Sequence, residues 1–101
     1  MSATPKVLFR GAATLTTTTT LYTTPAATTT MVSSLIVANT DTTSHTFTMA
    51  LGGVSIATDV SVPPNSVLVF DFKQVLVATN IIQGGSDSTT VTFNISGVEI
   101  A

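Results

Sequence analysis

The chain has 101 residues, of which three are basic and five are acidic, so its formal net charge is −2. Charged residues make up 8% of it, against about 25% in an average soluble domain; threonine at 22 positions and serine at 10 take their place. Three basic residues are too few for the phosphate contacts of a nucleic-acid-binding domain. The length allows one domain, and a chain without cysteine has no disulfide and no thiolate ligand.

Nothing in the first 20 residues has the pattern of an export signal. Lys6 and Arg10 are followed by no apolar stretch, because the run from Thr16 to Thr20 is polar. Nowhere do about 18 apolar residues follow one another, as a membrane helix requires. We therefore expect a chain that is made without export and is not placed in a membrane.

The types of residue and their alternation predict β-strands along the chain. Valine, isoleucine and threonine, whose β-branched side chains favour strands, occupy 40 of the 101 positions. Apolar and polar residues alternate in 46–51 and 90–95, and no window has the 3.6-residue period of a helix. The stretch 29–39 is apolar on both faces, which predicts a central strand. We expect strands at residues 6–13, 18–24, 29–39, 45–51, 54–58, 66–72, 75–83 and 89–100.

Turn residues separate these strands. Gly52-Gly53 between alternating runs predicts a two-residue hairpin whose central residues have positive φ. Residues 63–65 (Pro-Pro-Asn) end a pairing because proline has no amide hydrogen. Residues 84–88 (Gly-Gly-Ser-Asp-Ser) are expected to form a loop. Gly97 is expected to be a bulge, because the apolar positions change parity after it.

This spacing of strands and turns predicts an all-β fold, a single antiparallel β-sandwich of about eight strands with the jelly roll as one variant. Residues 21–101 are expected to form the sandwich domain. Residues 1–20 are expected to be an N-terminal segment that acts as an arm and includes a first strand.

The titratable residues indicate no catalytic site. His45 is the single imidazole, and the carboxylates of Asp41, Asp59, Asp71, Asp87 and Glu99 are each more than ten residues apart, unlike the ligands of a calcium loop. Catalysis would require the fold to bring the imidazole beside an aspartate in a cleft. We interpret the histidine as a polar residue at a strand end. We expect no enzyme, no cofactor and no metal site.

The uncharged surface has two interpretations. Threonine hydroxyls are short and form hydrogen bonds with little loss of entropy, which suits packed subunit interfaces, and a net charge near zero favours association. Alternatively, the threonines reflect only β-propensity on a solvated face. We favour assembly into an oligomer or onto a larger surface.

Several stretches also have a characteristic order. They are LYTTPA at residues 21–26, VSSLIVANT at 32–40, TFTM at 46–49, VPPNS at 62–66 and ISGVEI at 95–100. In this order they resemble a family of small virion proteins of tailed bacteriophages, over about residues 19–100. The family often has glycine after the Pro-Ala turn, where this chain has Ala27-Thr28.

The resemblance implies a non-enzymatic virion protein, found in the virion after synthesis in the bacterial host. One role is a capsid decoration (cement) protein that binds the outside of the major capsid protein lattice as a homo-oligomer, with a trimer favoured. The alternatives are a tail or baseplate accessory protein and a host-surface carbohydrate-binding module. The residues expected at the interface are Lys6, Val7, Leu8, Phe9, Arg10, Thr16, Thr18, Thr20 and Tyr22.

Overall fold

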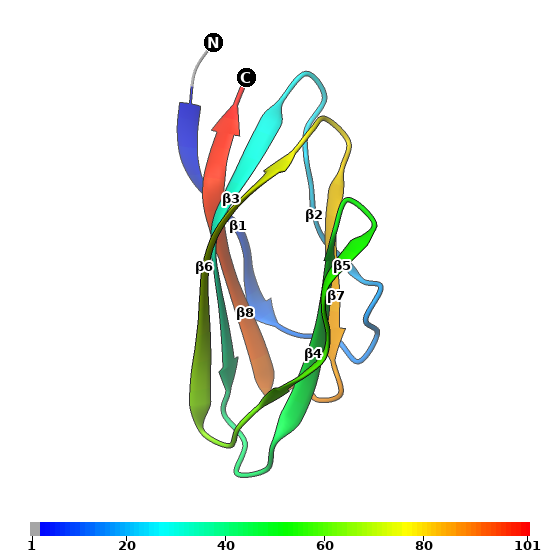
Figure 1. Ribbon diagram of the computed structural model, residues 1–101, viewed down its shortest axis with the longest axis vertical. Coiled ribbons are helices and arrows are strands. Elements are labelled where there is room, and N and C mark those ends of the chain that lie inside the picture. The colour runs from blue at the N-terminus through cyan, green and yellow to red at the C-terminus, as the bar shows by residue number, and fades with distance from the viewer. Residues whose placement is uncertain (1–2) are drawn as a thin grey trace.

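Eight β-strands account for most of the chain in the computed structural model, which describes residues 3–101 apart from the side chain of Phe72. They are β1 (Ala3–Ala12), β2 (Thr20–Thr23), β3 (Thr29–Asn39), β4 (His45–Leu51), β5 (Val54–Val62), β6 (Ser66–Leu76), β7 (Ile81–Ser86) and β8 (Val91–Ile100). Within these described residues there is no helix, and hence none that could cross a membrane. The strands run along an elongated body of 46 × 21 × 18 Å, with the start of β1 and the end of β8 at one end of it (Figure 1).

The strands form two antiparallel sheets of four. Sheet A has the order β1-β8-β3-β6, and sheet B has the order β2-β7-β4-β5. The chain changes sheet at every connection except the hairpin between β4 and β5. Eight strands in this order make a jelly roll. The all-β sandwich predicted by the sequence is therefore confirmed, and β3 lies centrally in sheet A, as its two apolar faces predict.

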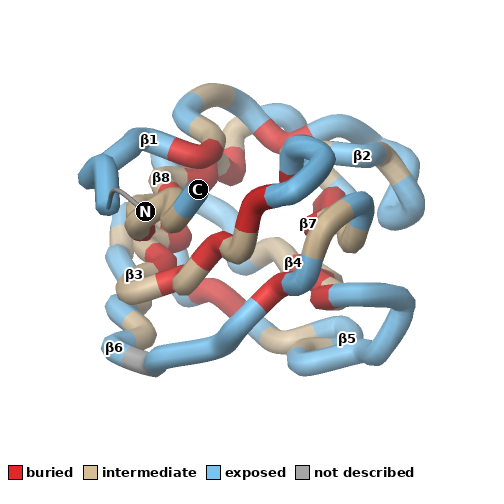
Figure 2. The backbone as a smooth tube through the Cα atoms, turned by 90° about the horizontal axis from the view of Figure 1, so that it is seen from above, coloured by how far each residue is buried: buried red, intermediate tan, exposed pale blue. Residues whose placement is uncertain are grey.

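The core lies between the sheets, where every second side chain of the central strands points inward. Figure 2 shows this as buried segments alternating along the strands, while β5 and β6 are largely exposed. The ring of Phe47 on β4 is centred 6.0 Å from Phe93 on β8, edge to face, and 6.0 Å from Phe70 on β6. These are favourable aromatic geometries. Phenylalanine pairs thus join sheet B to both a central strand and an edge strand of sheet A.

The turn between β4 and β5 is the two-residue hairpin expected from its glycines. Gly52 and Gly53 have φ of 57° and 83°, a left-handed pair that side chains disfavour and that matches the twist of a tight hairpin.

Residues 84–86 are strand, not the loop that their glycines predicted. They are the end of β7, and the connector between β1 and β2 (residues 13–19) lies against them: the amide of Gly84 donates to the carbonyl of Thr19 at 3.0 Å and that of Ser86 to Thr14 at 2.9 Å. A Cβ at Gly85 would lie 2.2 Å from the Thr16 carbonyl oxygen. The glycine is needed for this close approach of two backbones, not for a turn.

The irregularity expected at Gly97 lies on the strands beside it. Register shifts occur in β1 between Val7 and Phe9, opposite Ile95–Ser96 of β8, and in β3 between Val32 and Ser34, opposite Ser96–Gly97. In β8 itself the buried positions alternate without interruption through Gly97. The apolar residues after it are therefore not a change of parity, and the prediction of a bulge in β8 was wrong.

The N-terminal segment is part of the sandwich. β1 pairs with β8 along its length, from Ala3 opposite Ile100 to Ala12 opposite Thr92. Leu8 and Ala13 belong to the buried core, with 7% and 2% exposure. The predicted division into an arm of residues 1–20 and a domain of residues 21–101 is therefore not where the fold divides: the first strand expected in that segment is present, and it is structural.

Candidate functional site

The fold brings the single histidine between two aspartates, at the end of the molecule where three loops gather. β4 begins at His45, and its Nε2 lies 2.8 Å from Oδ2 of Asp41, in the loop after β3. Its Nδ1 lies 3.1 Å from Oδ1 of Asp87, at the start of the loop after β7. The juxtaposition that catalysis would require is thus partly present, although these aspartates are 46 positions apart in the sequence.

The charges of this cluster stabilise one another. The hydrogen bond to Asp41 is the main cause that raises the pKa of His45, and the same bond lowers the pKa of the Asp41 carboxyl. A protonated ring can donate to both aspartates, which leaves neither nitrogen free to accept a proton from a substrate. The carboxylates approach opposite ring nitrogens, and no metal-binding group of three is found among the described residues. The arrangement is suited to holding two loops against β4.

A buried asparagine joins the same loops from inside. Asn39, with 2% exposure, ends β3. Its Nδ2 donates to the carbonyls of Thr43 at 2.9 Å and Val62 at 3.2 Å, and its Oδ1 accepts from the amide of Asp41 at 3.0 Å. Thr40 donates both its amide and its hydroxyl to the carbonyl of Thr90, at 3.1 and 3.0 Å. These bonds connect the β3–β4, β5–β6 and β7–β8 loops at the lower end of Figure 1.

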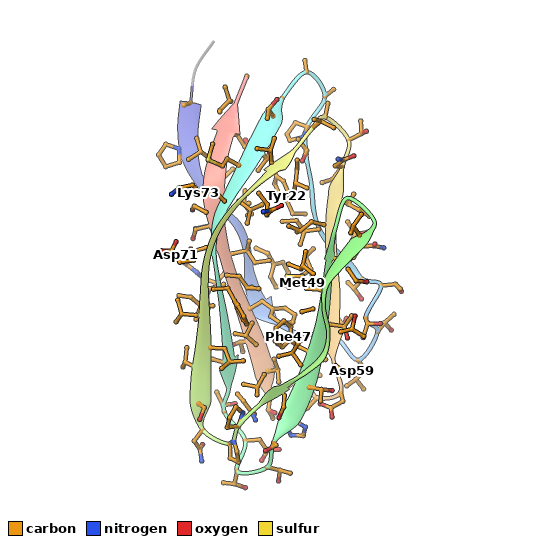
Figure 3. The ribbon with its side chains drawn as sticks, viewed as in Figure 1. Tyr22, Phe47, Met49, Asp59, Asp71 and Lys73 are labelled. Atoms are coloured by element: carbon orange, nitrogen blue, oxygen red, sulfur yellow. The ribbon has the colours of Figure 1, made fainter. Side chains whose placement is uncertain are left out.

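A second polar cluster occupies the opposite end. The hydroxyl of Tyr22 on β2 lies 2.8 Å from that of Thr30 and donates to Glu99, which also pairs with Lys6 at 3.3 Å. The pKa of Tyr22 is raised, first by burial and then by this bond, and the bond lowers the pKa of Glu99. Figure 3 shows Tyr22 directed between the sheets. A ring held in this way is not a free stacking platform for a sugar.

The expected interface residues do not form one surface. On β1, Leu8 is buried in the core, which does not fit a residue of an outer interface, and Phe9 is partly buried against the core, because β1 is a sandwich strand with an inner face. Val7 is 45% exposed, and Nε of Arg10 donates to Oδ1 of Asn94 at 2.7 Å across the outer face.

The threonines that were expected at the interface lie on the other side of the sandwich, beside sheet B. Thr16 and Thr18 are exposed in the β1–β2 connector, and Thr20 begins β2. The connector is held by its own hydroxyls: Oγ1 of Thr14 lies 2.6 Å from Oγ1 of Thr19, and both lie within hydrogen-bond distance of the Thr16 carbonyl. The threonine run is therefore a compact cover over β7.

The outer face of sheet A is the largest feature that the sequence reasoning missed. The outward residues of its two central strands are uncharged and half-buried: Met31, Ile36, Ala38, Thr92, Asn94, Ser96 and Val98. Charged side chains stand only on its two edge strands, Arg10 on β1 and Asp71 and Lys73 on β6. The apolar alternate positions of residues 29–39 already indicated such a face.

The flank between the two edge strands β5 and β6 is not closed. A cavity of about 310 Å³ lies there, lined by Ile56 and Ala57 of β5, Phe70 and Gln74 of β6, and the core residues Leu35 and Phe47. The lining is mainly apolar, so the chain leaves part of its core accessible between two strand edges.

Comparisons with models of protein families, with curated proteins and with solved structures found no match for this chain.

Proposed function

We propose that this protein is a non-enzymatic virion structural protein, a decoration (cement) protein that binds the outer surface of a tailed-phage head and stabilises it. Its partner is the major capsid protein. The proposal combines the resemblance of the sequence with one structural observation, the uncharged outer face of sheet A. The jelly roll is compatible with this role, since viral capsid proteins use it, but so do lectins and enzymes.

The outer face of sheet A has the composition of a protein interface. Interface centres are depleted in charged residues and are surrounded by a polar rim. Here β3 and β8 present uncharged side chains such as Ile36 and Asn94 at the centre, while Arg10, Asp71 and Lys73 lie on the edges. An uncharged face that extends along two central strands fits a broad surface such as a shell of capsid subunits.

Attachment through this face stabilises a head by mass action, because a ligand that binds only the assembled shell shifts the equilibrium toward it. The N-terminal segment contributes as the rim strand β1 and not as a detached arm, since residues 3–12 are paired with β8.

A binding role also agrees with the state of the polar clusters. Both ring nitrogens of His45 are engaged by aspartates, and Tyr22, Glu99 and Lys6 are engaged with one another. These groups hold loops and strands together, which is a structural use of titratable residues.

The location is tested by immunogold electron microscopy on particles of the phage that encodes the chain, with an antibody against the purified protein. Label spread over the head supports the proposal. Label confined to the tail or its tip overturns it in favour of an accessory or host-contact role, and particles without label overturn both.

The binding face is tested with a pair of matched variants. Ile36→Lys introduces a charge at the centre of the outer face of sheet A, whereas Ala50→Lys introduces the same charge on the outward side of β4 in sheet B. We expect the first to reduce the copies that sediment with heads at least tenfold and the second to leave them unchanged, with both proteins folded by circular dichroism. Equal binding of both variants would contradict this face.

A further inference from the structure

The edge strand β6 exposes apolar side chains in a way that β1 does not. Among the described residues, eight large apolar side chains are exposed, and six of them lie on β5, on β6 or directly after β6. On the outward side of β6, Val67, Val69 and Val75 are 57%, 65% and 59% exposed, and Val77, just after the strand, is 57% exposed. A long strand edge with such residues is a template for pairing with another strand.

The sequence of this edge is nearly palindromic. Residues 67–77 are VLVFDFKQVLV, with Phe72 at the centre. Moving outward from it, three of the five symmetric pairs of positions are identical: valine with valine, leucine with leucine, and valine with valine. A fourth pair is Asp71 with Lys73, which have opposite charges, and only the pair 70 and 74 is neither identical nor complementary.

We propose that two copies of this chain associate by antiparallel pairing of their β6 strands across a two-fold axis through Phe72. Sheet A then continues into sheet A of the second copy as one eight-stranded sheet. Asp71 of each copy faces the partner's Lys73, and Val69 faces the partner's Val75. Directly opposite side chains in such a pair have Cβ atoms about 4.5–5.5 Å apart, within reach of an ion pair.

Charge selects this register over its neighbours. Asp71 and Lys73 both lie exposed on the outward side, as Figure 3 shows, and neither has an ion-pair partner in the part of the chain that the structure describes. If the two-fold axis moves by one residue, to position 71 or 73, the outer faces of both copies still lie on the same side of the joined sheet. Asp71 then lies opposite the partner's Asp71, or Lys73 lies opposite the partner's Lys73. Like charges directly opposite each other are destabilising. Only the axis through Phe72 gives two opposite-charge pairs.

The open flank between β5 and β6 also favours a second copy of this chain as the partner. The second copy would lie beside the mouth of the 310 Å³ cavity between β5 and β6, where Phe70 and Gln74 of one copy face the partner's Gln74 and Phe70. Pairing would thus cover apolar surface that the single chain leaves accessible. The register of β6 with β3 shifts between Val32 and Ser34, opposite the centre of the palindrome, so the two copies would pair across a site of stronger local twist.

The proposal is tested with the purified full chain by sedimentation equilibrium, without any capsid. Lys73→Asp and Asp71→Lys each convert both ion pairs into like-charge pairs, and we expect each to raise the dimer dissociation constant about tenfold or more. The double variant Asp71→Lys/Lys73→Asp restores opposite charges and should dimerise as the wild type does. An equimolar mixture of the two single variants should also dimerise, because each then complements the other.

Arg10→Asp is the matched control, since it makes the same change of charge on β1, the other edge of sheet A, and should leave the dissociation constant unchanged. A wild-type chain that remains monomeric overturns the proposal. So does an oligomer, the expected trimer included, whose mass does not respond to Lys73→Asp, or a double variant that stays dissociated. Since no capsid is present, these outcomes are independent of whether the protein decorates a phage head.

Discussion

The two edges of sheet A are built differently, although they belong to one sheet. β1 has a proline at position 5, charges at Lys6 and Arg10, and a register shift beside Leu8. Each of these features discourages a further strand from pairing, because proline lacks a donor, charges must be desolvated, and a bulge twists the edge away. β6 also has a register shift and two charges, but it has neither proline nor glycine, and its charges are opposite, so an antiparallel second copy can pair them. One edge is protected, and the other is complementary to itself.

The two flanks of the sandwich differ in the same sense. On the β1–β2 side, residues 13–19 cover β7 and bond to its backbone. On the β5–β6 side no segment of the described chain fills the cavity. The chain thus closes one flank itself, and the other is the flank at which we propose that a second copy pairs.

The largest loss of stability should come from removing β1, the protected edge strand of sheet A. A chain that lacks residues 1–13 loses β1, leaves the edge of β8 unpaired and removes Leu8 from the core. Loss of one such leucine side chain costs about 2–5 kcal/mol, and the loss of a whole strand should exceed the roughly 5–15 kcal/mol that stabilise a domain of this size. We expect no cooperative urea transition by circular dichroism. A truncated chain with the wild-type midpoint would mean that β1 is an arm after all.

Truncation of a phenylalanine should be tolerated far better on the open flank. Phe93 is fully buried, so Phe93→Ala should destabilise the fold by about 3–5 kcal/mol. Phe70 is half-buried beside an existing cavity, so Phe70→Ala should cost about half as much or less. Urea unfolding of the two variants, measured on dilute protein, gives both values. Equal losses would show that the β5–β6 flank is as tightly packed as the centre.

The fit of the connector over β7 is tested by adding one methyl group. In Gly85→Ala the new Cβ would meet the Thr16 carbonyl, so the connector must move, and we expect a loss of about 1–3 kcal/mol. Gly11→Ala is the control, since its Cβ would be 3.6 Å from the Phe9 ring, an ordinary contact. The idea of a closed flank fails if differential scanning calorimetry finds no difference between the two variants.

The smallest effect on stability should come from the pair of His45 and Asp41, at the end of the molecule where the loops gather. The raised pKa of His45 stabilises the fold below about pH 6.5, and this contribution is lost as the pH rises through the higher folded value. The lowered pKa of Asp41 stabilises the fold above about pH 4 and is lost on acidification. The urea midpoint should therefore fall between about pH 5.5 and about pH 8. His45→Gln should remove this part of the decline; an unchanged pH profile would assign it to other groups.

The local features of the fold were predictable from the sequence. Strands 29–39 and 45–51 have the predicted boundaries, because their alternation is regular and is bounded by polar turns. The Gly52-Gly53 hairpin was predictable because its conformation depends on those two residues alone. Prediction failed where distant segments meet: residues 84–86 were expected to be a loop, but they pair with β4, and the connector of residues 13–19 lies against them.

The tendency to form β-strands with few charges is already present in the order of the residues, and so is the palindrome around Phe72. Alternation and β-branching act between neighbours, so they are present in the order of the residues. Three features follow from the folded arrangement of the strands: β6 is an edge strand, the outer face of sheet A is uncharged, and His45 lies between two aspartates. These features depend on which strands become neighbours, and that choice is made by the packing of two sheets around one core.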